Sequence, residues 1–227
     1  MINLIKKLLI LNFFLIFSMP LLAFSSSNFL ISQSAFKNHD YSESLSSFST
    51  NEIKLPNSNL LDKLISAVIT DDIYLAYKIA SEILLKDSEN QEAYIVKLAY
   101  LYSHNKFNKI KEIHKTSKNK NELVNFIFFN NLELKDNTTI SKSLVDIVVS
   151  SFTSTNQKSL NYNFLLFYAS LAKIIDGQND RATLIKGELF QNVKQPKVAE
   201  KTFLIIPSNS PYYLDAQISL AVNYSNF

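Results

Sequence analysis

The chain has 227 residues, of which 47% are hydrophobic, and its formal net charge at pH 7 is +3. Two glycines and five prolines are too few for the many tight turns of a β-sandwich or barrel, so the composition predicts helices joined by short polar turns. A single arginine, Arg181, argues against the Arg-rich basic stripe of a nucleic-acid-binding protein, and the absence of cysteine excludes disulfides.

The first residues have the pattern of a secretory signal peptide. Lys6 and Lys7 precede an almost continuously apolar run at 8–22, and small residues follow it. The pattern predicts a signal peptide at residues 1–23 that is cleaved near Ala23. Cleavage is favoured over an anchor because the apolar run of 15 residues is shorter than the roughly 20 residues that a membrane-spanning helix needs. An exported chain without cysteine fits the bacterial periplasm, and the alternative is an uncleaved inner-membrane anchor that leaves the protein facing the periplasm.

Apolar residues at steps of three and four predict helices along the rest of the chain. The predicted helices cover residues 27–38, 40–50, 60–69, 72–86, 91–104, 107–115, 122–134, 139–152, 161–176, 180–189, 196–205 and 211–225. Gly177 follows one of them and is expected to close it in the left-handed conformation. The last helix has Leu214, Ile218, Ala221 and Val222 on one side, and we expect either that it caps the stack, or that this side packs on a partner, or that the chain is a fragment of a longer repeat protein.

One apolar position recurs with a fixed period. Ala76, Ile110 and Leu144 lie 34 residues apart, each on the apolar stripe of a predicted second helix, and 34 residues is the length of a tetratricopeptide unit. With an aromatic Tyr94 in a first helix, the stretch 60–118 resembles the tetratricopeptide-repeat (TPR) family.

This stretch also departs from the family pattern. Ser88 stands where the closing proline is usual, and Asp71 or Asn105 stands at the glycine of the turn within a unit. The resemblance implies an all-α fold, an α-solenoid of antiparallel helix pairs wound into a TPR-like superhelix. The implied organisation is a TPR-like array at 24–152 and further degenerate repeats of that array at 153–227, after a polar run.

Residue patterns typical of catalysis are missing from the sequence. His39, His104 and His114 have no acidic residues at metalloprotease or catalytic-dyad spacing, and the chain contains no glycine-rich phosphate loop and no Gly-x-Ser-x-Gly elbow. We therefore expect a protein that is not an enzyme, with no catalytic residue, no cofactor and no metal.

The predicted function is that of an exported scaffold for protein–protein interaction in the bacterial cell envelope. Its first helices are expected to line a concave groove that holds an extended segment or a helix of a protein partner, at Gln33, Lys37, Tyr102 and Ser103. Nucleic acid is not an expected partner. Two alternatives stay open: a membrane-anchored envelope assembly factor, and a fragment of a larger exported protein whose active part lies beyond Phe227.

Overall fold

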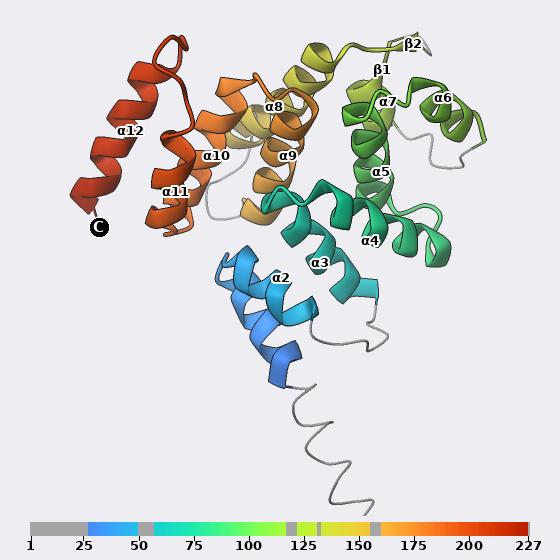
Figure 1. Ribbon diagram of the computed structural model, residues 1–227, viewed down its shortest axis with the longest axis horizontal. Helices are drawn as coiled ribbons and strands as arrows, with labels where there is room; N and C mark the ends of the chain where they lie inside the picture. Colours follow the sequence, from blue (N-terminus) through green and yellow to red (C-terminus); the bar gives the residue numbers. More distant parts are fainter. Residues whose placement is uncertain (1–26, 50–56, 117–121, 131–132, 155–159, 227) are drawn as a thin grey trace, which may run out of the picture. The chain divides into compact units, whose positions relative to one another are not determined.

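The computed structural model describes residues 27–49, 57–116, 122–130, 133–154 and 160–226, and within them the fold is almost entirely α-helical (Figure 1). The chain divides into two compact units at residues 55 and 56. The predicted all-α fold of helical repeats is confirmed. The expected boundary at residues 152 and 153 stays a prediction.

The first unit contains a helix over 27–37 and α2 (Tyr41–Ser49). The second unit contains the other described elements: α3 (Asn57–Ile69), α4 (Ile73–Lys86), α5 (Gln91–Ser103), α6 (Phe107–Thr116), α7 (Glu122–Phe128), β1 (Phe129–Asn130), β2 (Glu133–Leu134), α8 (Asn137–Ser154), α9 (Tyr162–Ile175), α10 (Asp180–Asn192), α11 (Pro196–Phe203) and α12 (Tyr213–Asn226).

One type of turn recurs within the helix pairs. Two residues after the last helical residue comes a non-glycine residue with positive φ, and the N–H of the residue after it donates to the carbonyl five residues earlier, as in a Schellman motif. In the α3–α4 turn Asp71 has a φ of 63° and Asp72 N donates to Ala67 O at 2.9 Å. The same pair of features occurs at His39, Asn105 and Lys194, so the pairs α5–α6 and α10–α11 and the pair in the first unit close in the same way.

The recurring turn explains the 34-residue spacing. Ala76 and Ile110 each lie five residues after the left-handed residue of their pair, and both are fully buried. Ser44 and Ala199 occupy the same position in the other two pairs and are also fully buried. Leu144 is buried as well, but α8 follows a hairpin, so the structural period covers Ala76 and Ile110 without extending to Leu144.

A second type of turn joins one pair to the next. Asp87 ends α4 and Asp176 ends α9, each in an extended conformation. Three residues later, the side chain of Asn90 accepts a hydrogen bond from Ala93 N at 3.0 Å, and Asn179 accepts one from Ala182 N at 2.9 Å. These are ordinary asparagine N-caps, which satisfy free N–H groups in the first turn of a helix.

The expectation of a left-handed cap at Gly177 is wrong. Among the described residues no glycine has a positive φ. Gly177 lies inside the second type of turn, where Asp176 ends the helix and Asn179 begins the next one. The left-handed residue of this part of the chain is Lys194, after α10, which places the recurring turn one helix later than the sequence indicated.

The predicted helix over 122–134 is also wrong in its second half. The helix α7 ends at Phe128, and Phe129 pairs with Leu134 in the antiparallel β1–β2 hairpin. Phe129 stacks on His114 of α6, with ring centroids 3.8 Å apart. An apolar run of this length fits a strand as well as a buried helix, and these contacts from other elements favour the strand.

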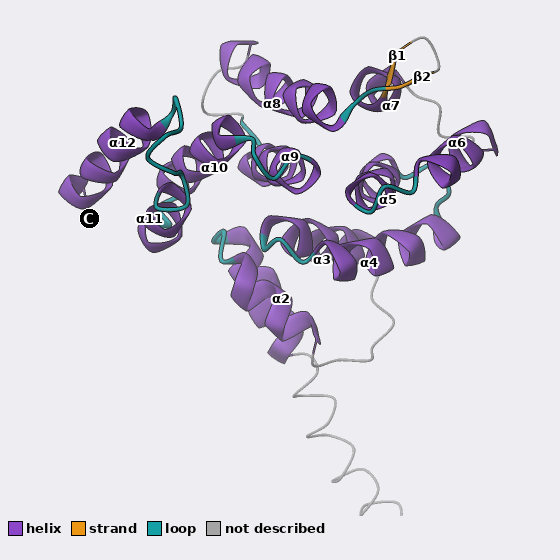
Figure 2. Ribbon diagram, turned by 45° about the horizontal axis from the view of Figure 1, so that its top comes forward, coloured by secondary structure: helices purple, strands orange, loops and turns teal. Residues whose placement is uncertain are grey.

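Helix α9 lies at the centre of the second unit. It packs against its sequence neighbours α8 and α10 and also against α3 and α5, which precede it by several helices (Figure 2). Nine of its 14 residues are buried. In a linear array each repeat contacts only its neighbours, so the packing of α9 on α3 and α5 is a departure from an open solenoid.

Candidate interaction surfaces

The four predicted groove residues are divided between the two units. Gln33 is half-buried and Lys37 is exposed on the helix over 27–37, whereas Tyr102 and Ser103 end α5 in the second unit. Ser103 is half-buried, and its hydroxyl donates to Tyr100 O at 2.9 Å. A groove shared by all four residues stays a prediction.

Tyr102 is only 1% exposed, which leaves little of its side chain for a partner to contact. Its hydroxyl donates to the carbonyl of Lys135 at 2.5 Å, and burial, with a smaller contribution from the charge of Asp136, raises its pKa. Tyr102 forms part of the wall of a hollow of about 680 Å³ between the α5–α6 turn and the start of α8. Its main role is therefore to fasten the hairpin region to α5.

Lys135, at the same hollow, is similarly held in place. Its ammonium group donates to Phe126 O and lies 3.4 Å from the hydroxyl of Ser143. Burial lowers its pKa. The hydrogen bonds of this lysine are made within the fold.

Each of the three histidines contacts other side chains or backbone groups of the fold. His39 Nδ1 lies 3.0 Å from the Tyr41 hydroxyl, His104 Nδ1 lies 2.8 Å from Tyr100 O, and His114 is 7% exposed beneath Phe129. Within the part of the chain that the structure describes, no group of three or more His, Asp or Glu residues is placed to hold a metal ion.

Aromatic rings from α4 and α5 form a small surface cluster. Tyr77 stacks on Tyr100 with ring centroids 4.1 Å apart, and Tyr100 lies 4.1 Å from the ring of His104. Tyr74 extends the cluster, is 56% exposed, and has the Lys78 ammonium group 4.3 Å from its ring centroid. These rings hold α4 and α5 together while keeping aromatic surface in contact with solvent.

Helix α12 has apolar side chains on two opposite faces. Ala216 and Leu220 are buried on the face that contacts α10 and α11. On the opposite face Leu214, Ile218 and Val222 are 68%, 55% and 46% exposed, at a spacing of four residues that forms a continuous stripe. Figure 1 shows α12 beside α11, at the edge of this unit. The sequence pattern predicted the apolar composition of this face, and what covers it stays a prediction.

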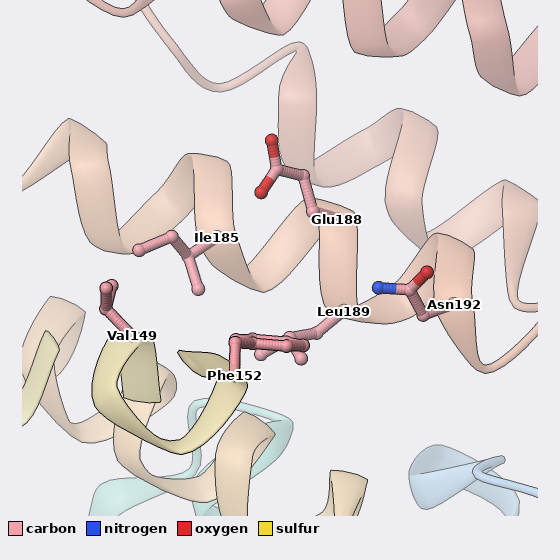
Figure 3. A pocket seen from close by; sticks show the side chains of 6 residues that line it. All are labelled: Val149, Phe152, Ile185, Glu188, Leu189 and Asn192. Atoms are coloured by element: carbon pink, nitrogen blue, oxygen red, sulfur yellow. The ribbon is translucent and has the colours of Figure 1, made fainter. Parts of the chain in front are cut away.

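A further hollow, of about 270 Å³, separates α8 from α10 (Figure 3). Its lining comes from a short stripe on each helix: Val149 and Phe152 from α8, and Ile185, Glu188, Leu189 and Asn192 from α10. Sequence reasoning missed this hollow. The sequence places Ile185, Glu188, Leu189 and Asn192 on one face of a helix. It does not show that a space remains between this face and α8.

None of the described helices has the length and apolarity needed to cross a lipid bilayer. The predicted signal peptide at residues 1–23 lies outside the described residues. No family model, curated protein or solved structure matches the chain.

Proposed function

We propose that the protein is an exported, non-catalytic scaffold of the bacterial cell envelope that binds another protein. The observation that carries this proposal is the exposed stripe of Leu214, Ile218 and Val222 on α12. Large apolar side chains exposed on neighbouring turns of one helix are typical of a protein-interaction surface. Their spacing of four residues suits the ridge of a partner's apolar helix.

The repeated helix pairs support the scaffold part of the proposal. In the pair α10–α11 the residues Gly187, Phe190, Ala199 and Phe203 follow the glycine-x₂-aromatic and alanine-x₃-phenylalanine spacings of tetratricopeptide units. A Cβ atom on Gly187 would lie 2.3 Å from the ring of Phe203, so these two positions are in direct contact. We infer a divergent TPR-like array, whose family members present surfaces to protein partners.

The partner surface is tested by crosslinking in the bacterium that makes the protein. We expect the wild-type chain to capture a discrete envelope protein, and the double variant Leu214→Lys, Ile218→Lys to lose it, because two buried cations would disrupt an apolar interface. The matched control is Leu85→Lys, at a side chain that is 89% exposed on α4. Equal capture by all three proteins, or capture by none, contradicts the proposal.

Export is tested by mass spectrometry of the mature N-terminus. A first residue near Phe24 supports cleavage after the predicted signal peptide. An intact Met1 in the membrane fraction contradicts the freely soluble scaffold and favours the anchored alternative.

A further inference from the structure

The hollow between α8 and α10 has an apolar interior and a polar rim. Leu189 is fully buried and forms the floor, while Val149, Phe152 and Ile185 are half-buried and form the walls. Glu188 and Asn192 are exposed, one and two turns of α10 away from Ile185 (Figure 3). Apolar walls with one acidic group at the edge suit a ligand that is itself apolar at one end and cationic at the other.

Glu188 lacks a counter-charge within the described part of the chain. It takes part in no hydrogen bond or ion pair there, whereas Lys186 of the same helix is paired with Asp71. Partial desolvation beside the hollow, and next the charge of Asp215 on α12, raise the pKa of the Glu188 carboxyl group. Two carboxylates therefore act on the same region, and a positive charge beside Glu188 would relieve both the desolvation and the repulsion.

We propose that this hollow binds an alkylammonium group, with the aliphatic stem between α8 and α10 and the cation at the Glu188 carboxylate. The volume of about 270 Å³ is slightly smaller than the roughly 300–1,000 Å³ of pockets for drug-sized ligands, and it accommodates one flexible stem of four or five carbons. Two kinds of molecule carry such an alkylammonium group: a protein with an accessible lysine side chain, and a free diamine. This site is separate from the exposed face of α12, and its existence does not depend on the proposed function.

The test is an NMR titration of the mature protein, following the methyl groups of Val149, Ile185 and Leu189. The probes are cadaverine (1,5-diaminopentane) and lysine blocked at both backbone ends, with pentanol as the neutral comparison. We expect saturable shifts of these methyl groups with both amines and up to about fivefold weaker binding of pentanol, since a partly exposed ion pair is worth up to about 1 kcal/mol.

Two variants identify the carboxylate responsible. Glu188→Gln is expected to weaken amine binding about fivefold while leaving pentanol binding unchanged. Glu112→Gln, at an exposed position of α6 outside the hollow, is the matched control and is expected to bind as the wild type does. An unchanged backbone spectrum away from the hollow shows that each variant is folded.

The two amine probes distinguish the sources of the ligand. Tighter binding of blocked lysine favours a protein side chain, tighter binding of cadaverine favours a free diamine, and either result supports the alkylammonium site. The inference is overturned if the amines do not shift these methyl groups, if Glu188→Gln binds them as tightly as the wild type, or if pentanol binds as tightly as they do. The result of the crosslinking experiment on α12 does not affect these outcomes, so the two proposals can fail independently.

Discussion

Lys186 is a buried cation whose partner comes from a distant part of the chain. Its ammonium nitrogen lies 2.9 and 3.1 Å from the two carboxylate oxygens of Asp71, 115 positions earlier. The lysine side chain is 8% exposed and that of Asp71 is 58% exposed. Removing one member of such a pair leaves the other charge without compensation, and this costs more than the pair contributes as a whole.

Asp71→Asn is therefore expected to lower the free energy of unfolding by about 1–3 kcal/mol at pH 7, as measured by urea denaturation. Asparagine tolerates the left-handed conformation of this position, so the substitution changes the charge and keeps the turn. Asp72→Asn is the control, because asparagine caps a helix as well as aspartate does. Lys186→Met added to Asp71→Asn should recover stability, and equal losses in Asp71→Asn and Asp72→Asn would contradict the role of the ion pair.

The raised pKa of Glu188 predicts that its effect on stability depends on pH. Partial desolvation and the charge of Asp215 raise its pKa in the folded state, so its ionised form is disfavoured by folding. Its presence therefore lowers stability above the folded pKa and has no such effect below the unfolded value of about 4.3. Glu188→Gln should raise the melting temperature at pH 8 and leave it unchanged at pH 3.5. A melting temperature that falls at pH 8 would show that Glu188 is stabilised as an anion.

At the scale of elements, the close contact between α10 and α11 depends on a missing side chain. An added Cβ at Gly187 would lie 2.3–2.9 Å from three ring atoms of Phe203, which is itself fully buried. A glycine inside a helix costs about 1 kcal/mol relative to alanine, so this close packing must outweigh that cost.

Gly187→Ala is expected to lower the free energy of unfolding by about 1–2 kcal/mol, because overpacking exceeds the gain in helix propensity. Gly177→Ala is the matched control. It has no atom within 4 Å of the added Cβ and no positive φ, so its stability should be unchanged or slightly increased. Chemical denaturation of both variants gives the comparison, and a stabilised Gly187→Ala would mean that α10 and α11 are further apart than the structure shows.

The recurring turn provides another test at this scale. Lys194 has a φ of 59°, a conformation that costs an ordinary L-residue about 1–2 kcal/mol and glycine almost nothing. Lys194→Gly should raise the free energy of unfolding by about 1 kcal/mol, whereas Lys201→Gly, inside α11, should lower it by a similar amount. Thermal melts of the two variants should move in opposite directions. Destabilisation by both would show that residue 194 is not left-handed.

Most helices were predictable from the sequence because their apolar stripes and polar caps are local signals. The helix predicted over 91–104 is observed at Gln91–Ser103, with the Asn90 side chain capping it. The β1–β2 hairpin was not predictable, since the stacking of Phe129 on His114 and the bond from Tyr102 to Lys135 join residues far apart in sequence. Likewise, the face of α12 was foreseen from its spacing, but the Glu188 hollow depends on how α8 and α10 diverge.

At the scale of the whole molecule, the packing of α9 makes the second unit differ from a linear chain of repeats, in which each repeat contacts only its neighbours. The run of apolar residues in α9 is typical of a buried helix, but a sequence does not show which helices cover it. The structure places α9 against α3 and α5 as well as α8 and α10, and burial in this packing raises the pKa of Tyr168 to about 12. Residues 57–226 should therefore unfold as one cooperative unit, with no progressive loss from the ends.

Leu166→Ala, in the centre of α9, is expected to lower the free energy of unfolding by about 2–5 kcal/mol, because Leu166 is fully buried. Native-state hydrogen exchange should then show protection falling together in α3, α5, α8 and α10. In a linear array the loss would be limited to α8 and α10. Leu85→Ala, at an exposed side chain of α4, is the control and should leave all four helices unchanged.

The packing of α9 on α3 and α5 also sets the order of events during translation. Helix α9 ends at Ile175, 72 residues after α5 ends at Ser103, and a ribosome that adds about 5–20 residues per second needs roughly 4–14 seconds for that interval. During that time α3 and α5 have been made, and the helix that covers their apolar surface has not. A newly made chain thus passes through a stage in which it is prone to associate with other chains, and a holding chaperone would act at that stage.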